Sequence, residues 1–428
     1  MKVLNHKYLP AYFFGIVTMG YISIYIFMLY TNRFSPFCIA DECRYISFAE
    51  NLLNGFYSPP SPNINLWSGP GFPILLMPLV SLHADRSMLI LLNVLISIGV
   101  IIVMFKTAIL FLSQSKALIV SLIWSLYYPH YQEIFTVLTE PFTTLLLISF
   151  AYFITKYVHN CRKIAGLFSG ILLGYLVLTK VIFCYVLILL LFLLIVFYLF
   201  KLSRNLFRQF IFVWIIAFSV TIPYQLYTYN LTGKIYYFAN SGGSSLYFMT
   251  SPYLGEFGEW NNTTFTVNCG YNIDVPCNAE KFKKNHSRFF EYLKKLDPIA
   301  ADEEFKKRSI QNILAHPIKY LKNYINNFSR MLFNIPNSYF YQREQTILRI
   351  IPNSFVFVFM VLGIIYSLMN YKKLPNSVLI IIIFVLSYLS IQLLVSAYPR
   401  HFNVIVPLIF IWLAVVKETW IEGLRNVY

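Results

Sequence analysis

Long apolar runs separated by short polar links dominate the pattern of hydrophobic and polar positions along the chain. The run from Val181 to Phe200 contains no charged side chain. A helix of about 20 apolar residues spans the hydrocarbon core of a bilayer. The pattern therefore predicts an all-α polytopic membrane protein with about ten transmembrane helices, near Ala11–Tyr30, Met88–Phe105, Ala117–Tyr128, Val137–Tyr157, Ile164–Leu178, Val181–Phe200, Phe210–Tyr227, Phe355–Met369, Val378–Val395 and Val404–Val416.

Two apolar segments need a separate interpretation. Ala11–Tyr30 is longer than the hydrophobic region of a signal peptide and no small-residue cleavage site follows it, so we expect it to be the first span. Trp67–Val80 is short and broken by prolines, so it is predicted to be re-entrant or to lie on the membrane surface.

The basic residues predict the orientation of the spans. Alternate links are rich in Lys and Arg and are expected on the cytoplasmic side, which places both termini there. Two long segments, 31–87 and 228–350, then lie outside. The chain is accordingly divided into an N-terminal membrane module over residues 1–227, an external segment of mixed structure over 228–350, and C-terminal membrane helices over 351–428. The basic links contain Lys106, Lys116, Lys156, Arg162, Lys163, Lys201, Arg204, Arg208, Lys372 and Lys373.

The composition agrees with a membrane protein. The 428 residues are 58% hydrophobic and 12% charged, whereas a soluble domain has about a quarter of its residues charged. The formal net charge of +16 is explained by the basic links and by contact with anionic membrane lipids, and it does not predict a nucleic-acid partner.

Four cysteines fall in the predicted external segments, where disulfides persist. We expect a Cys269–Cys277 bridge. For Cys38 and Cys43 a bridge and two free thiols are equally supported, because such short loops are often strained.

Candidate chemistry begins with Asp41 and Glu42, just beyond the first span. Adjacent, partly buried carboxylates have raised pKa values, so one can act as a general base while the other positions it or contacts a divalent cation. Arg44 carries the planar donors that suit a phosphate oxygen. A charge pair at a helix N-terminus explains the same residues equally well. A Walker motif is absent, so the sequence gives no support for nucleotide use.

Three more charged residues lie at the same predicted boundary: Glu140, Lys180 and Arg400. Each alone is explained as an interfacial anchor. Together with the Asp41 segment they suit a site where cations hold a lipid phosphate and an acid activates a hydroxyl group.

Several segments, in sequence order, resemble the polytopic GT-C glycosyltransferases that use polyprenyl-phosphate sugars, the group containing the protein O-mannosyltransferases and the lipid A aminoarabinose transferase. The chain departs from the common pattern at Ser68–Gly69 and Cys43. The similar segments are Asp41–Tyr45 (DECRY), Gly69–Pro73 (GPGFP), Thr139–Phe142 (TEPF), Leu178–Lys180 (LTK), Asn240–Trp260, Ala315–Leu321 (AHPIKYL) and Tyr398–Pro407.

The resemblance implies an inverting transfer of a sugar from a polyprenyl-phosphate donor to a hydroxyl acceptor on a lipid-linked glycan, a protein or an envelope polymer. Asp41 would be the base, Glu42 its support or a contact for a divalent ion, and Glu140 a second acid. The remaining expected site residues are Arg44, Lys180 and Arg400 at the phosphate, and Tyr45, Tyr247 and Tyr398 at the substrate loop.

Two alternatives stay open. An O-antigen-type polysaccharide polymerase also has about ten spans and a long external loop, but its key basic residues are expected in late loops. A transporter or flippase usually shows inverted repeats and polar groups at mid-membrane, and the sequence shows neither.

Overall fold

The computed structural model describes residues 8–199, 204–261, 279–339 and 345–425, and the regular secondary structure in these ranges is entirely helical. Each predicted span overlaps one α-helix. The fold is therefore that of an all-α polytopic membrane protein, as the apolar pattern predicts. The ten helices are α1 (Leu9–Tyr30), α4 (Arg86–Ala108), α5 (Gln114–Ser125), α7 (Glu140–Asn160), α8 (Lys163–Thr179), α9 (Ile182–Leu199), α10 (Arg204–Thr232), α15 (Gln345–Met369), α16 (Asn376–Gln392) and α18 (Val406–Arg425).

Helix length and hydropathy separate these ten helices into groups. Among the described residues, α1, α4, α7 and the segments Phe207–Thr232 and Thr346–Met369 are long and apolar enough to cross a membrane. The apolar helices α8 and α16, and Ile182–Val196 within α9, are shorter.

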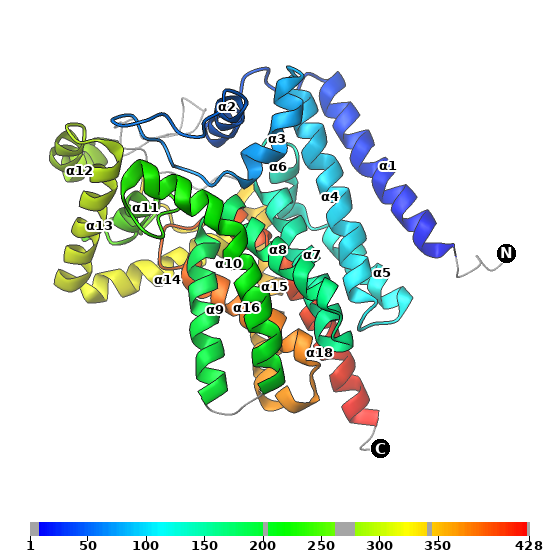
Figure 1. The fold of residues 1–428 in the computed structure, drawn as a ribbon. Coiled ribbons are helices and arrows are strands. Elements are labelled where there is room, and N and C mark those ends of the chain that lie inside the picture. Colours follow the sequence, from blue (N-terminus) through cyan, green and yellow to red (C-terminus); the bar gives the residue numbers. More distant parts are fainter. Residues whose placement is uncertain (1–7, 200–203, 262–278, 340–344, 426–428) are drawn as a thin grey trace.

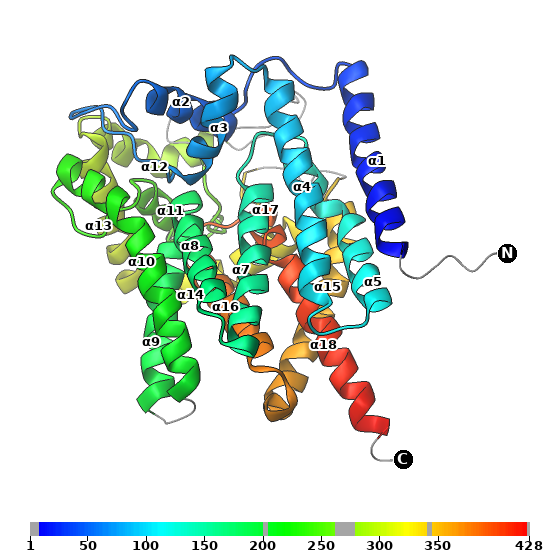
Figure 2. The same ribbon diagram turned by 45° about the vertical axis from the view of Figure 1, so that its right-hand side comes forward.

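The ends of the helices define two ends of the molecule. Helix α18 ends at one of them, and α2 (Asp41–Leu53) and α3 (Gly71–Ser81) lie at the other (Figures 1 and 2). We call the second the site end. The segment predicted to be re-entrant or surface-lying is α3, which packs against α2 and α8.

Close helix packing in the bundle depends on glycine. Gly170 and Gly174 of α8 lie against α10, where a Cβ atom would collide with Ile216 and with the Ala217 carbonyl. Small residues four apart let two membrane helices approach closely. A second close approach lies at the site end, where Gly69 and Gly71 meet the backbone of Leu178 and Thr179 and fix the start of α3 beside the end of α8.

The segment between α10 and α15 has its own small hydrophobic cluster, apart from the main core. Its helices lie beside the bundle near the site end (Figure 1). They are α11 (Gly242–Met249), α12 (Ala279–Leu293), α13 (Pro298–Ala315) and α14 (Pro317–Phe333). The cluster consists of Tyr247, Phe248, Phe282, Phe290, Leu293, Phe305 and Tyr339.

One of the two cysteine expectations can be compared with the structure. Cys38 and Cys43 form a disulfide, so the free-thiol alternative for this pair is wrong. Cys269 and Cys277 lie outside the described residues.

Candidate active site

Asp41 and Glu42 form the first turn of α2 at the site end. A helix N-terminus carries partial positive charge, which favours carboxylates there. The disulfide between Cys38 and Cys43 ties the preceding loop to this turn. The position of both acids is therefore fixed by the start of the helix and by a covalent link.

Asp41 is held between two arginines. Its Oδ1 accepts a hydrogen bond from Arg44 Nη1 at 3.0 Å, and its Oδ2 accepts one from Arg400 Nη2 at 2.7 Å. Arg400 belongs to α17 (Pro399–Asn403), far away in the sequence. Burial by itself would raise the pKa of Asp41, but the charges of Arg400 and Arg44 outweigh burial and lower that pKa below its ordinary value. Asp41 is therefore ionised at neutral pH.

Glu140, the first residue of α7, extends this arrangement. Its Oε1 accepts a hydrogen bond from Lys180 Nζ at 2.8 Å, and Arg400 Nε lies 3.7 Å from the same oxygen. Five predicted site residues thus form one chain of alternating charge, in the order Arg44, Asp41, Arg400, Glu140 and Lys180. We call it the charge chain. Three cations face two carboxylates, so the charge chain keeps a net positive charge.

Glu42 lies outside the charge chain. Its two oxygens accept hydrogen bonds from Arg86 Nε and Nη2 at 2.7 and 2.9 Å, and Oε1 also accepts one from the Val137 amide at 3.1 Å. The two adjacent acids therefore bind different cations, and Glu42 links α2 to α4. No group of three or more His, Cys, Asp or Glu side chains in the described ranges is placed to hold a metal ion, and a divalent ion at Asp41 and Glu42 stays a prediction.

The three predicted tyrosines lie in different surroundings. Tyr45 is buried beside the charge chain, and its pKa is raised by burial and by the charges of Asp41 and Glu140. Tyr398 precedes α17 and donates a hydrogen bond to the Trp260 carbonyl at 2.8 Å. Tyr247 belongs to the separate aromatic cluster, where packing explains its position without a contact to the site.

A cavity of about 1200 Å³ lies beside the charge chain. Small-molecule sites are typically about 300–1000 Å³, so this cavity has room for a sugar and its phosphate. Arg44 Cζ lies 5.1 Å from the centre of the Trp67 ring, and aromatic rings of this kind can stack on sugars. The lining includes Asp41, Arg44, Arg400, Trp67, Trp260 and Tyr398.

The same cavity is lined by two charged residues that the sequence analysis missed, Glu133 and Arg349. Glu133 lies in α6 (Tyr131–Ile134) and is 4% exposed. Its Oε1 accepts a hydrogen bond from Asn403 at 3.1 Å, whereas its Oε2 has no partner. Burial raises the pKa of Glu133 to about 7, with the charge of Arg349 opposing the shift and that of Glu140 adding to it. Glu133 could have been found by the sequence signal that pointed to Glu140, which is an acid near the end of a predicted span.

Glu133 also lines a second, much smaller cavity of about 20 Å³, together with Glu140 and Asn403. Glu133 Oε2 and Asn403 Oδ1 have no hydrogen-bond partner. A cavity of this size has room for one water molecule. Glu140 therefore belongs to the wall between the charge chain and this small cavity.

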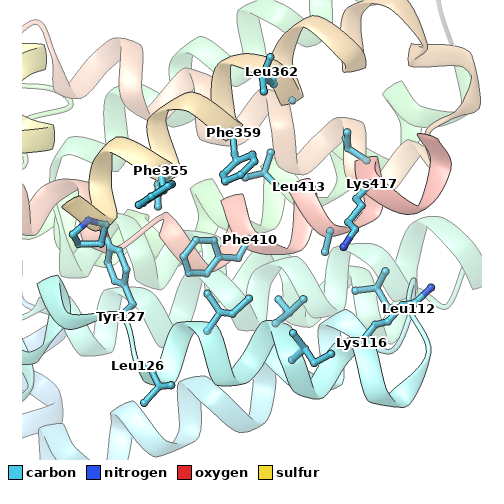
Figure 3. Close-up of a pocket in the computed structure, with 18 of the residues that line it drawn as sticks. Leu112, Lys116, Leu126, Tyr127, Phe355, Phe359, Leu362, Phe410, Leu413 and Lys417 are labelled. Carbon is cyan, nitrogen blue, oxygen red and sulfur yellow. The ribbon is translucent and has the colours of Figure 1, made fainter. Parts of the chain in front are cut away.

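An apolar groove of about 1440 Å³ runs between α5, α15 and α18 (Figure 3). Phe355, Phe359 and Leu362 on α15 face Phe410 and Leu413 on α18 across it. Tyr127 lies at one end, and Lys116 and Lys417 lie at the other, where Lys116 pairs with Glu418 (Figure 3). Tyr128 and Leu348 also line the groove. Tyr128 lines both this groove and the polar cavity, so the two are neighbours at the site end.

No family model matches the chain, and no curated protein matches it. The chain is similar to the solved structure of ArnT from Cupriavidus metallidurans bound to undecaprenyl phosphate, with a TM-score of 0.40 and 14% sequence identity over 94% of this chain and 78% of that one. This likeness is too low to place the chain in that family.

Proposed function

We propose that the chain is a membrane glycosyltransferase that moves a sugar from a polyprenyl-phosphate donor to an acceptor hydroxyl, with inversion at the anomeric carbon. The charge chain carries this proposal. It joins Asp41, Glu140 and three cations from four separate parts of the sequence beside one cavity. The bias of basic residues toward the opposite side of the membrane supports a reaction on the external face.

Asp41 is the proposed general base. It is ionised, it lines the cavity and it is reachable by a hydroxyl group there. The acceptor oxygen attacks the anomeric carbon and its proton passes to an Asp41 oxygen. The bond between that carbon and the phosphate oxygen breaks, and the phosphate leaves with the electron pair. Because phosphate is a good leaving group, no general acid is required.

The cations of the charge chain stabilise the departing phosphate. Negative charge develops on the departing phosphate, and preorganised positive groups stabilise such charge most in a site that excludes water. Arg44 and Arg400 line the cavity. Lys180 does not, and it acts through Glu140, which holds it and lies close to Arg400.

The apolar groove supports a lipid-linked donor. Its lining is almost wholly apolar between the two ends, and its site end adjoins the polar cavity at Tyr128. A substrate with an anionic head and a long hydrocarbon chain matches this combination. A soluble sugar nucleotide has no long hydrocarbon chain and would leave the groove unfilled.

The test is transfer by reconstituted wild type and Asp41→Asn from labelled polyprenyl-phosphate sugars to host membrane extract. We expect Asp41→Asn to lose about a hundredfold to ten-thousandfold in rate, the range that a general base contributes. Glu291→Gln is the matched control, because Glu291 is an exposed acid paired with Lys294 three residues away, as Asp41 is with Arg44.

Two results would contradict the proposal. Equal transfer by wild type and Asp41→Asn removes Asp41 as the base. Turnover only of a diphosphate-linked oligosaccharide, with no turnover of monophosphate sugars, favours a polysaccharide polymerase.

A further inference from the structure

Arg349 differs from every cation of the charge chain. Its side chain is 8% exposed. Its Nη2 donates a hydrogen bond to Gln132 Oε1, but its Nη1 has no hydrogen-bond partner. It forms no ion pair with a carboxylate of the described residues. Burying a guanidinium group without an anion is costly, so this position is incomplete without one.

The other candidate cations already have a carboxylate partner. Arg44 and Arg400 bind Asp41, and Lys180 binds Glu140. The carboxyl group of Glu133 is close enough to Arg349 for its pKa to respond to the arginine charge, yet the two form no ion pair. Among the described cations that line the polar cavity, Arg349 is therefore the one without a carboxylate partner, whereas Arg44 and Arg400 each pair with Asp41.

The position of Arg349 relates it to both cavities. Arg349 lines the polar cavity, whereas its neighbour Leu348 lines the apolar groove. Tyr128 lines both. A molecule with its chain in the groove and its head in the cavity thus passes Arg349 at the point where the chain ends and the head begins.

We propose that Arg349 binds the phosphate of the polyprenyl donor while the prenyl chain lies in the groove between α5, α15 and α18. Gln132 positions the guanidinium group. The planar donors of arginine match two phosphate oxygens. This assignment rests on the proposed function and changes it in one respect: Arg349 becomes the main phosphate ligand, and Arg400 remains with Asp41 and Glu140.

The length of the groove suits a long hydrocarbon chain. Helix α5, with 12 residues, is about 18 Å long, and the groove follows it from Tyr127 to Lys116 (Figure 3). The ion pair between Lys116 and Glu418 lies at the far end of the groove. An acyl chain of a phospholipid is a competitor of similar length, so an anionic phospholipid must be included in the test.

The test measures binding of a labelled long-chain polyprenyl phosphate to the purified full chain. We expect Arg349→Ala to weaken binding at least tenfold and Arg349→Lys to restore part of it. The control is Arg308→Ala, because Arg308 is exposed on α13 outside the cavity. The corresponding polyprenol should bind wild type and Arg349→Ala equally and weakly. Inorganic phosphate and phosphatidylglycerol should fail to compete at equal concentration.

Each contrary outcome has a distinct meaning. Unchanged binding by Arg349→Ala, with loss in Arg400→Ala, overturns the assignment and leaves the glycosyltransferase proposal standing. Equal competition by phosphatidylglycerol makes the groove a general lipid site and overturns the choice of occupant. Wild type that prefers polyprenyl phosphate no more than polyprenol contradicts both proposals. Melting temperatures of all variants separate lost binding from lost folding.

Discussion

Two regions of the molecule bury a carboxylate, and they do so in opposite ways. In the segment between α10 and α15 the carboxylate of Glu256 receives hydrogen bonds from His286 Nε2 at 3.0 Å and Asn285 Nδ2 at 2.7 Å, as well as from Ser251 and Tyr339. At the site end, Glu133 Oε2 and Arg349 Nη1 have no partner. A complete polar network stabilises a fold, whereas an incomplete one needs an explanation such as a ligand.

The largest effect on stability is expected at Glu256. Glu256→Ala leaves His286, Tyr339 and Ser251 without their shared acceptor, and breaking a buried pair of this kind costs about 3 to 5 kcal/mol. Thermal unfolding of the purified chain should reveal the loss, while transfer per folded molecule stays at the wild-type level. A loss of transfer in the folded fraction would show that the two regions are not separate.

Glu140→Gln should lower the rate of transfer strongly and the stability of the fold only slightly. The variant keeps an acceptor for Lys180 but removes the negative charge that compensates Lys180 and Arg400. We expect transfer to fall at least a hundredfold, since electrostatic groups at a reacting centre contribute about 2.7–4 kcal/mol, and stability to fall by only about 1 to 3 kcal/mol. Transfer within twofold of wild type would mean that Glu140, like Glu256, stabilises the fold and does not contribute to transfer.

Glu133 predicts a pH dependence that Glu256 should not share. Its pKa in the folded protein, about 7, is above the ordinary value of 4.5, so the folded state holds a proton that the unfolded state releases. The stability contributed by Glu133 is complete below pH 4.5 and is lost as pH rises toward 7, by about 3 kcal/mol at most. Melting temperatures from pH 4.5 to 8 should fall in wild type and remain flatter in Glu133→Gln. Equal slopes in both proteins would contradict the buried-proton interpretation.

Most of the fold could be predicted from the sequence because long apolar runs permit few structures in a bilayer. The charge chain was partly predictable for a related reason. Charged residues are rare in this chain, and those near one boundary, such as Asp41, Glu140 and Lys180, have few places to be neutralised. Their order and pairing depend on tertiary contacts that the spacing of residues does not contain.

Adjacent residues illustrate the limit of sequence reasoning. Asp41 and Glu42 suggest one shared site, but neighbouring helix positions do not face the same way. Glu42 therefore binds Arg86 while Asp41 binds Arg400. Arg349 was missed because its missing partner is visible only once α15 is packed against the segment that contains Gln132.

The smallest predicted effect concerns the Cys38–Cys43 disulfide. The bridge closes a loop with a sequence separation of 5, and the entropy of so short a loop contributes about 2 kcal/mol at most. Cys38→Ser/Cys43→Ser should therefore fold and lose transfer only severalfold, because Arg44 and Arg400 still hold Asp41. Cys161→Ser is the control, since Cys161 is an exposed free thiol. Transfer should fall when wild type or the control is reduced, and reductant should not change the double variant. Complete loss of transfer in the double variant would mean that the bridge, and not the two ion pairs, holds Asp41 in its working position.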